Sequence, residues 1–271
     1  MKFDQLCVNT MCYTSFDLDQ ALAGIAQTGV KSVELCASLG YCDHAAPEKL
    51  GSDADGQLAR TLEKHGLQAL SLSAHADITT QPGLDAFNTR LQLTADLGIQ
   101  VIITSVPDTG SPPDFGKQYS HTIYGLADCA ADLGITLCLE SWGLGMHTAR
   151  SAVEFIQSLG HSNLLINYDP AARIYHGSAL PGKDEITIMA GHLGHVHLNN
   201  KISLRRQAWD FCPVPDGLVD WYPLLAELDL ADFAGPTSIE IGWPQAPESI
   251  NLVNDAVRRS CEYVLGYFGG H

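Results

Sequence analysis

The chain has 271 residues, 45% of them hydrophobic, which is enough apolar material for one large α/β domain. Its formal net charge of −16 argues against binding to nucleic acid or to an anionic membrane, because such partners need a basic footprint. We find no apolar run of the ~18 residues that a membrane span needs, no signal peptide and no CxxC pair among the eight cysteines, so we expect a cytoplasmic protein with reduced thiols.

One pattern recurs along the chain after an opening strand in residues 3–12. A helix-like segment ends in glycine, and a short run rich in Val, Ile and Leu follows, as expected for a helix cap and then a strand buried on both faces. Helices are predicted within residues 17–29, 83–98, 122–134, 148–160, 218–230 and 248–268. The joints between helix and strand span residues 26–36, 62–75, 94–107, 130–141, 156–170, 190–200 and 230–243.

This alternation predicts parallel strands with helical crossovers. Eight strands in a chain of this length favour a single (β/α)8 TIM barrel over residues 1–271. An open, doubly wound sheet is the competing fold. No GxGxxG or GxxxxGK[ST] motif follows any predicted strand, which weakens the nucleotide-binding form of that alternative.

Polar residues stand at the ends of the last four predicted strands. These residues are Glu140, Asp169, His197 and Glu240. Alone, each is more often a solvated loop residue, a turn former or a hydrogen-bonded structural residue. In a barrel, however, the carboxyl ends of all strands meet at one rim, where the chemistry of such enzymes takes place. The joint pattern therefore predicts one shared site.

Three carboxylates that face one another repel, and a divalent cation resolves that conflict. Oxygen ligands with a single imidazole suit Mn²⁺, Mg²⁺ or Co²⁺ best, with Zn²⁺ as a further possibility. In the stretch GHVHLNN, residues 194–200, His197 is the better ligand because it lies nearer the carboxyl end of its strand. We expect His195 to support the site or to form a hydrogen bond inside the barrel.

The blocks LCLESWG, HSNLLINYDPA, GHVHLNN, PDGLVDW and TSIEIGW make the chain similar to the xylose isomerase-like sugar phosphate isomerase/epimerase superfamily, which includes the tagatose 3-epimerase type. The resemblance covers mainly the second half of the chain. It implies that the four residues bind one divalent metal and that Glu140 and Glu240 exchange protons with a ketose or a related polyol-carbonyl through an enediolate. It also implies a small sugar-like substrate and a homodimer or homotetramer.

Three positions depart from the pattern of the epimerases in this superfamily. Ala172 stands where they have a histidine, Ser203 where they have an arginine, and Met146 where a glutamate is frequent. Other residues must therefore hold the substrate. Candidate substrate-binding residues are His75, Glu34, His147 and Arg206, with His176 as a further candidate and with Trp209 and Phe211 in the long segment 201–217.

The departures make a second function plausible, a metal-dependent dehydratase acting on a keto-cyclitol or a dehydroshikimate-like substrate. Two further alternatives belong to other classes. Apurinic-site endonucleases of this barrel type bind three zinc ions through additional histidines, but Ala172 and the block PDGLVDW lack the expected ligands. A barrel without activity could instead bind a sugar or a partner subunit, although all four predicted metal ligands are present.

Overall fold

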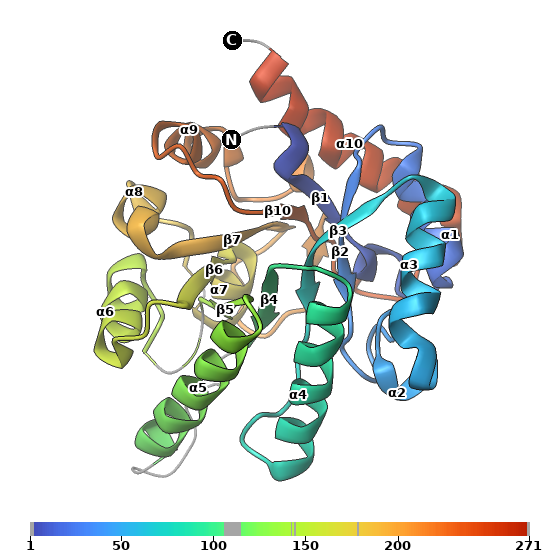
Figure 1. Cartoon of the computed structure of the whole chain (residues 1–271). Helices are drawn as coiled ribbons and strands as arrows, with labels where there is room; N and C mark the ends of the chain where they lie inside the picture. The colour runs from blue at the N-terminus through green and yellow to red at the C-terminus, as the bar shows by residue number, and fades with distance from the viewer. Residues whose placement is uncertain (1–2, 106–114, 142, 144, 178, 270–271) are drawn as a thin grey trace.

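The computed structural model describes residues 3–105, 115–141, 143, 145–177 and 179–269. Eight parallel strands close into a barrel in the order β1-β10-β7-β6-β5-β4-β3-β2, and helices surround it (Figure 1). The predicted TIM barrel is therefore confirmed. Its strands are β1 (Leu6–Asn9), β2 (Ser32–Cys36), β3 (Gln68–Ser73), β4 (Val101–Thr104), β5 (Thr136–Glu140), β6 (Leu164–Tyr168), β7 (Leu193–Leu198) and β10 (Thr237–Ile239).

Each of the six predicted helical segments contains a helix, and four shorter or more polar helices were not predicted. The helices are α1 (Leu18–Ala26), α2 (Pro47–Leu50), α3 (Ala54–His65), α4 (Gln81–Asp96), α5 (Phe115–Asp132), α6 (Ala149–Leu159), α7 (Pro170–Gly177), α8 (Glu185–Met189), α9 (Trp221–Leu230) and α10 (Ile250–Gly269). Short 3-10 helices cover Phe3–Gln5, Thr10–Tyr13, Gly51–Asp53, Ala190–His192 and Val214–Asp216. Among the described residues, no helix combines the length and the apolar character that crossing a membrane requires.

Side-chain caps fix where several helices begin. Asp17 accepts a hydrogen bond from the backbone of Gln20 at the start of α1, and the Gln20 side chain returns one to the Asp17 backbone. Thr148 and Ser151 form the same reciprocal pair at the start of α6. These bonds satisfy backbone donors that have no partner within the helix, and they turn each chain segment back toward the next strand.

The helix-ending glycines of the predicted pattern divide into two groups. Five of the seven have positive φ, as a left-handed cap requires; they are Gly29, Gly66, Gly98, Gly134 and Gly160. Gly194 instead lies inside β7, and a Cβ there would stand 2.6 Å from the Sγ of Cys138. A Cβ on Gly235 would stand 2.5 Å from the carbonyl oxygen of Gly194. At these two joints glycine is required for close packing between strands.

The segment after β7 forms a small hairpin. Its strands β8 (Asn200–Lys201) and β9 (Phe211–Cys212) pair antiparallel, so the predicted long loop is tied together at its base. Trp209 lies two residues before β9 and is held close to the barrel mouth as a result. The hairpin was not predicted, because two-residue strands leave no periodic pattern in the sequence.

Buried polar side chains fill part of the barrel interior. Asn9, Glu34, Ser71, Asn167 and His195 are all fully buried, and they come from β1, β2, β3, β6 and β7. Burial of a polar group is costly unless it is hydrogen-bonded. This layer therefore has to be a connected network, and it lies directly under the strand ends that carry the predicted ligands.

We expect Gly194→Ala to destabilise the protein by about 1–3 kcal/mol, because the new methyl group has no free space between Cys138 and Leu165. Thermal unfolding would measure the loss as a lower melting temperature. Gly125→Ala in α5 is the control, since a Cβ there meets nothing within 4 Å and should raise helix propensity. Equal melting temperatures for the wild type and Gly194→Ala would contradict the packing argument.

Candidate metal centre

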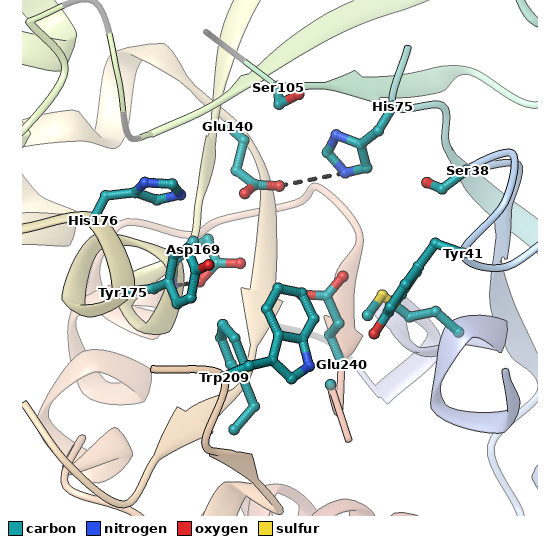
Figure 2. Close-up of a pocket in the computed structure, with 14 residues that line it drawn as sticks. Ser38, Tyr41, His75, Ser105, Glu140, Asp169, Tyr175, His176, Trp209 and Glu240 are labelled. Atoms are coloured by element: carbon teal, nitrogen blue, oxygen red, sulfur yellow. Dashed lines mark hydrogen bonds and ion pairs between the residues drawn. The ribbon is translucent and has the colours of Figure 1, made fainter. Parts of the chain in front are cut away.

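Four strands that neighbour one another in the barrel each bring one predicted ligand to the same rim. Glu140 is the last residue of β5, and Asp169 directly follows β6. His197 lies near the end of β7, and Glu240 directly follows β10. All four are buried, and Figure 2 shows the three carboxylates converging within one pocket.

One imidazole nitrogen lies close to all three carboxylates. The Nδ1 atom of His197 lies 3.4 Å from Oδ2 of Asp169. It lies 3.5 Å from Oε2 of Glu240 and 3.7 Å from Oε2 of Glu140. Ligand atoms that share one ion at about 2.1 Å lie roughly 3–3.5 Å apart. The distances from His197 to each carboxylate are therefore close to those that a common cation requires, and Glu140, Asp169 and His197 also lie within 4.8 Å of one another.

Amide donors hold two of the carboxylates in place. The Asn199 side chain donates to Oδ2 of Asp169 at 2.8 Å and to Oε2 of Glu240 at 3.1 Å. The backbone N–H of Ala172 donates to the other oxygen of Asp169 at 2.6 Å, and Asn9 donates to the other oxygen of Glu240 at 3.2 Å. Both oxygens of each carboxylate therefore have a hydrogen-bond donor, and the oxygens that Asn199 contacts are the ones nearest to His197.

Glu34 lies beneath His197 and does not line the pocket. Its carboxylate oxygens lie 3.0 Å from Nε2 of His197 and 2.8 Å from Nε2 of His195. They also accept hydrogen bonds from the Ser71 hydroxyl, at 3.0 Å, and from the Asn9 side chain. Glu34 was predicted to bind substrate, and its complete burial corrects that prediction. It anchors His197, and His195 supports the same carboxylate as expected.

The contact with Glu34 determines the tautomer of His197, that is, which of its ring nitrogens carries the proton. A carboxylate only accepts hydrogen bonds, so the proton of neutral His197 belongs on Nε2, next to Glu34. The lone pair is then on Nδ1, which accepts a hydrogen bond from the Asn167 side chain at 3.1 Å and is the ring nitrogen that faces the three carboxylates. A carboxylate behind the metal-binding histidine is a common way to fix its tautomer and its orientation.

The electrostatics of the group show an excess of negative charge. Burial raises the pKa of Glu240 to about 8, and the charges of Asp169 and Glu34 add to that increase against the opposing effect of His197. Burial alone would lower the pKa of His197, but the charges of Glu240 and Glu34 hold it well above its usual range. Both groups therefore retain protons, because the centre favours positive charge.

A divalent cation fits this donor set. It would compensate the same negative charge while displacing the protons from Glu240 and His197. Three carboxylate oxygens and one imidazole nitrogen suit Mn²⁺, Mg²⁺ or Co²⁺, and Zn²⁺ also accepts such ligands. Glu140, Asp169 and His197 already offer ligand atoms that all lie within 4.8 Å of one another. We name Glu140, Asp169, His197 and Glu240 as the residues that would hold the ion.

A pocket of about 290 Å³ opens above the centre, at the lower end of the range for small-molecule sites. Three of the four predicted ligands, Glu140, Asp169 and Glu240, line it. Its other described lining residues are Met11, Ser38, Tyr41, His75, Ser105, Ala172, Tyr175, His176, Trp209, Phe211 and Gly242.

The predicted substrate-binding residues do not all reach this pocket. His75 does, and its Nε2 lies 3.5 Å from Oε2 of Glu140 (Figure 2). Burial, followed by the charge of His197, lowers the pKa of His75 to about 4. His176 also lines the pocket. His147 and Arg206 are exposed and lie outside the described lining, so this structure gives neither a direct contact.

Sequence reasoning missed several residues of the site. Asn9 ends β1 and Asn199 directly follows β7, and both donate hydrogen bonds to the carboxylates. The position of Asn199 at the end of a predicted strand, in GHVHLNN, was a signal that could have identified it. Tyr41 and Tyr175 line the pocket from a loop and from α7. Nothing in the local sequence distinguishes these two tyrosines from surface residues.

The fold and the site together define a barrel with a buried, acidic cluster at the carboxyl ends of its strands that could hold a metal ion. A family model described as "xylose isomerase-like TIM barrel" matches residues 22–263. The chain belongs to that family. A search of curated proteins finds no match to the chain.

Solved structures of this fold cover nearly the whole chain. The IOLI protein with a bound zinc atom has 16% identity and a TM-score of 0.76, over 97% of this chain and 98% of the other. A D-allulose 3-epimerase from Methylomonas sp. has 18% identity and a TM-score of 0.73, over 97% of both chains. The probable 3-DHS dehydratase AsbF from Bacillus anthracis has 15% identity and a TM-score of 0.73, over 96% of this chain and 98% of the other. At these identities, the likeness shows the fold alone.

Saturating Mn²⁺ should raise the melting temperature of the wild type by about 5–10 °C. Binding at 100 times the dissociation constant stabilises by about 2.7 kcal/mol, and each kcal/mol is worth roughly 2–4 °C in a chain of this size. Asp169→Asn removes a charged ligand and should reduce the rise to below about 2 °C. Asp55→Asn, at an exposed position on α3, should keep the full rise. An unchanged wild-type melting temperature would show that no ion binds at this centre.

Glu34→Gln should weaken Mn²⁺ binding about 10- to 100-fold, measured by titration calorimetry. The glutamine side chain places an NH2 donor where one carboxylate oxygen accepted a hydrogen bond. The imidazole nitrogen that faces this NH2 can then no longer act as a donor. Glu185→Gln is the matched control, because Glu185 is also a buried carboxylate but pairs with Arg173 and Tyr168. Unaltered Mn²⁺ affinity in Glu34→Gln would contradict the anchoring role.

Proposed function

We propose that the protein is a divalent-metal-dependent isomerase or epimerase acting on a ketose or a related polyol-carbonyl. One observation carries the proposal, namely that three carboxylates lie within 3.7 Å of one imidazole nitrogen at the base of a pocket of small-molecule size. A divalent ion held there would polarise a substrate oxygen as a Lewis acid. The similarity in fold to a D-allulose 3-epimerase supports the same reaction class.

Glu140 and Glu240 would carry the proton transfers. They stand at the carboxyl ends of β5 and β10, which β6 and β7 separate in the barrel, and they enter the pocket from different sides (Figure 2). One carboxylate removes the proton from the carbon next to the carbonyl, and the bonding electrons form an enediolate. The other group returns a proton to the opposite face, which gives an epimer. Return of the proton to the neighbouring carbon gives an aldose–ketose isomer.

The surroundings of the two glutamates suit these roles. Asn9 and Asn199 fix both oxygens of Glu240, which keeps the carboxylate aimed into the pocket. Glu140 lies beside His75, whose depressed pKa keeps its imidazole neutral at physiological pH. A neutral imidazole can donate one hydrogen bond to a substrate oxygen without competing for the proton being transferred.

A metal-dependent dehydratase is the second candidate. Ala172 lines the pocket with a methyl group, and the Ser203 hydroxyl donates to Asp210, so neither position supplies the side chain expected in an epimerase. Proton removal by the same glutamate would then be followed by loss of the β-hydroxyl as water, with the proton supplied by a pocket acid. The similarity in fold to the probable dehydratase AsbF agrees with this alternative.

Glu140→Gln and Glu240→Gln should each reduce product formation by at least about 10²-fold at saturating Mn²⁺, because each removes one proton-transfer group. The assay incubates ketoses and keto-cyclitols with each variant in D2O. The variant that retains the first base should still incorporate deuterium into the substrate without forming product. The other variant should do neither.

Two controls make this assay decisive. Glu185→Gln, which changes a buried carboxylate outside the centre, should keep wild-type turnover per metal-loaded protein. A new enone absorbance in the wild-type reaction would assign the dehydratase, and an altered sugar without that absorbance would assign the isomerase or epimerase. Full turnover in either centre variant would refute its assigned role.

A further inference from the structure

We propose that the pocket selects an uncharged, ring-shaped polyol-carbonyl, such as a keto-cyclitol or a cyclic sugar, and rejects phosphorylated or carboxylated substrates. The inference rests on the proposed function, because it takes this pocket as the substrate site. It is carried by the distribution of aromatic and charged side chains around the centre.

Aromatic and polar side chains occupy different walls of the pocket. In Figure 2, Tyr175, Trp209 and Tyr41 follow one another from left to right along the lower part of the pocket, and Ser105, His75 and Ser38 lie along its upper right part. A six-membered polyol ring is itself two-sided, with hydroxyls at its edge and C–H groups on its faces. Such a ring can place a C–H face against the aromatic rings while its hydroxyls point to the polar wall. An open chain offers no comparable flat apolar face.

Mutual contacts build the aromatic wall from three separate segments. Trp209 packs edge-to-face against Tyr41 at 5.8 Å and against Tyr175 at 5.6 Å between ring centroids. It also lies 4.9 Å from the Phe211 ring. Tyr41 comes from the loop after β2, Tyr175 from α7 and the other two from the hairpin. Because each ring supports the next, the wall is preorganised before any ligand binds.

A buried lysine stabilises the hairpin that carries Trp209 and Phe211. Lys201 is fully buried and pairs with Asp210, and its ammonium lies 4.9 Å from the Phe211 ring centroid and 5.6 Å from that of Tyr175. It does not belong to the described pocket lining. Its charge therefore supports the rings and does not face a ligand.

No arginine or lysine belongs to the described lining, in which His75 and His176 are the only basic side chains. Arg173, the arginine on α7, pairs with Glu185. Among the described lining residues, an anionic group on a substrate therefore finds no lysine or arginine partner.

The charge of the centre adds to this selection. Three carboxylates and one divalent cation leave one net negative charge, and buried Glu34 lies directly behind them. Placing an anion in such a site costs its desolvation without a compensating ion pair. A neutral polyol carries no such penalty, and its hydroxyls can bond with serine, histidine and carboxylate groups.

Calorimetric titration of the Mn²⁺-loaded protein tests the charge selection. D-Fructose and D-fructose 6-phosphate form one matched pair, and 2-keto-myo-inositol and 3-dehydroshikimate form a second pair of rings without and with a carboxylate. A salt concentration of about 0.15 M limits long-range repulsion, so that the local site is measured. In at least one pair, the neutral member should bind at least about tenfold more tightly than the anion. Equal or tighter binding of the anion in both pairs, or no binding of either neutral ring, overturns the inference.

Variants test the walls separately. Trp209→Ala should weaken binding of the neutral ring about 3- to 10-fold and leave the open-chain ketose L-erythrulose nearly unaffected. Leu204→Ala, an exposed position on the same hairpin, is the matched control and should change neither. Ser38→Lys should improve binding of the anionic member of each pair, because it supplies the missing partner charge. An equal loss for ring and open chain in Trp209→Ala would overturn the ring preference, and no gain for the anions in Ser38→Lys would overturn the charge argument.

Turnover measured on the same samples separates the two proposals. Conversion of only the phosphorylated or carboxylated compounds would overturn the inference and leave the proposed function standing. Selective binding of neutral rings without metal-dependent conversion of any compound would support the inference on ligand class and contradict the proposed function.

Discussion

The site depends on holding three carboxylates close to a single imidazole nitrogen inside a protein. Each carboxylate repels the other two, and burial strengthens that repulsion. The arrangement is possible because hydrogen bonds from neighbouring groups fix three of the four members. Asn199 and Asn9 hold Glu240, Asn199 and the Ala172 backbone hold Asp169, and Glu34 holds His197 from behind. The remaining charge is what makes the centre suitable for a cation.

The sequence was sufficient to predict the barrel and to bring the four predicted ligands to one rim, for physical reasons. Parallel strands buried on both faces leave a continuous apolar run, and the polar residue that ends each run must emerge at the rim. Glu140, Asp169 and Glu240 could therefore be placed without coordinates. His197 could be preferred over His195 from its position alone, because side chains two apart on a strand share a face at different depths.

The remaining features depend on contacts between residues far apart in the chain. Glu34 lies on β2 and its partner His197 on β7, so only the closed barrel shows that they form a pair. Trp209 meets Tyr41 and Tyr175 only because a two-residue ladder folds its segment back. Arg206 occupies the same segment but is exposed, since the ladder fixes the base of the hairpin and leaves its tip in solvent.

Asn199 ties the spacing of two ligands to the outer layer of the barrel. Its amide group donates to both Asp169 and Glu240, and its backbone carbonyl accepts from the indole of Trp221 at the start of α9. The two carboxylates therefore cannot separate without breaking one of these bonds. Helix α9, which contributes no described residue to the pocket lining, therefore helps to fix the separation of two carboxylates at the barrel mouth.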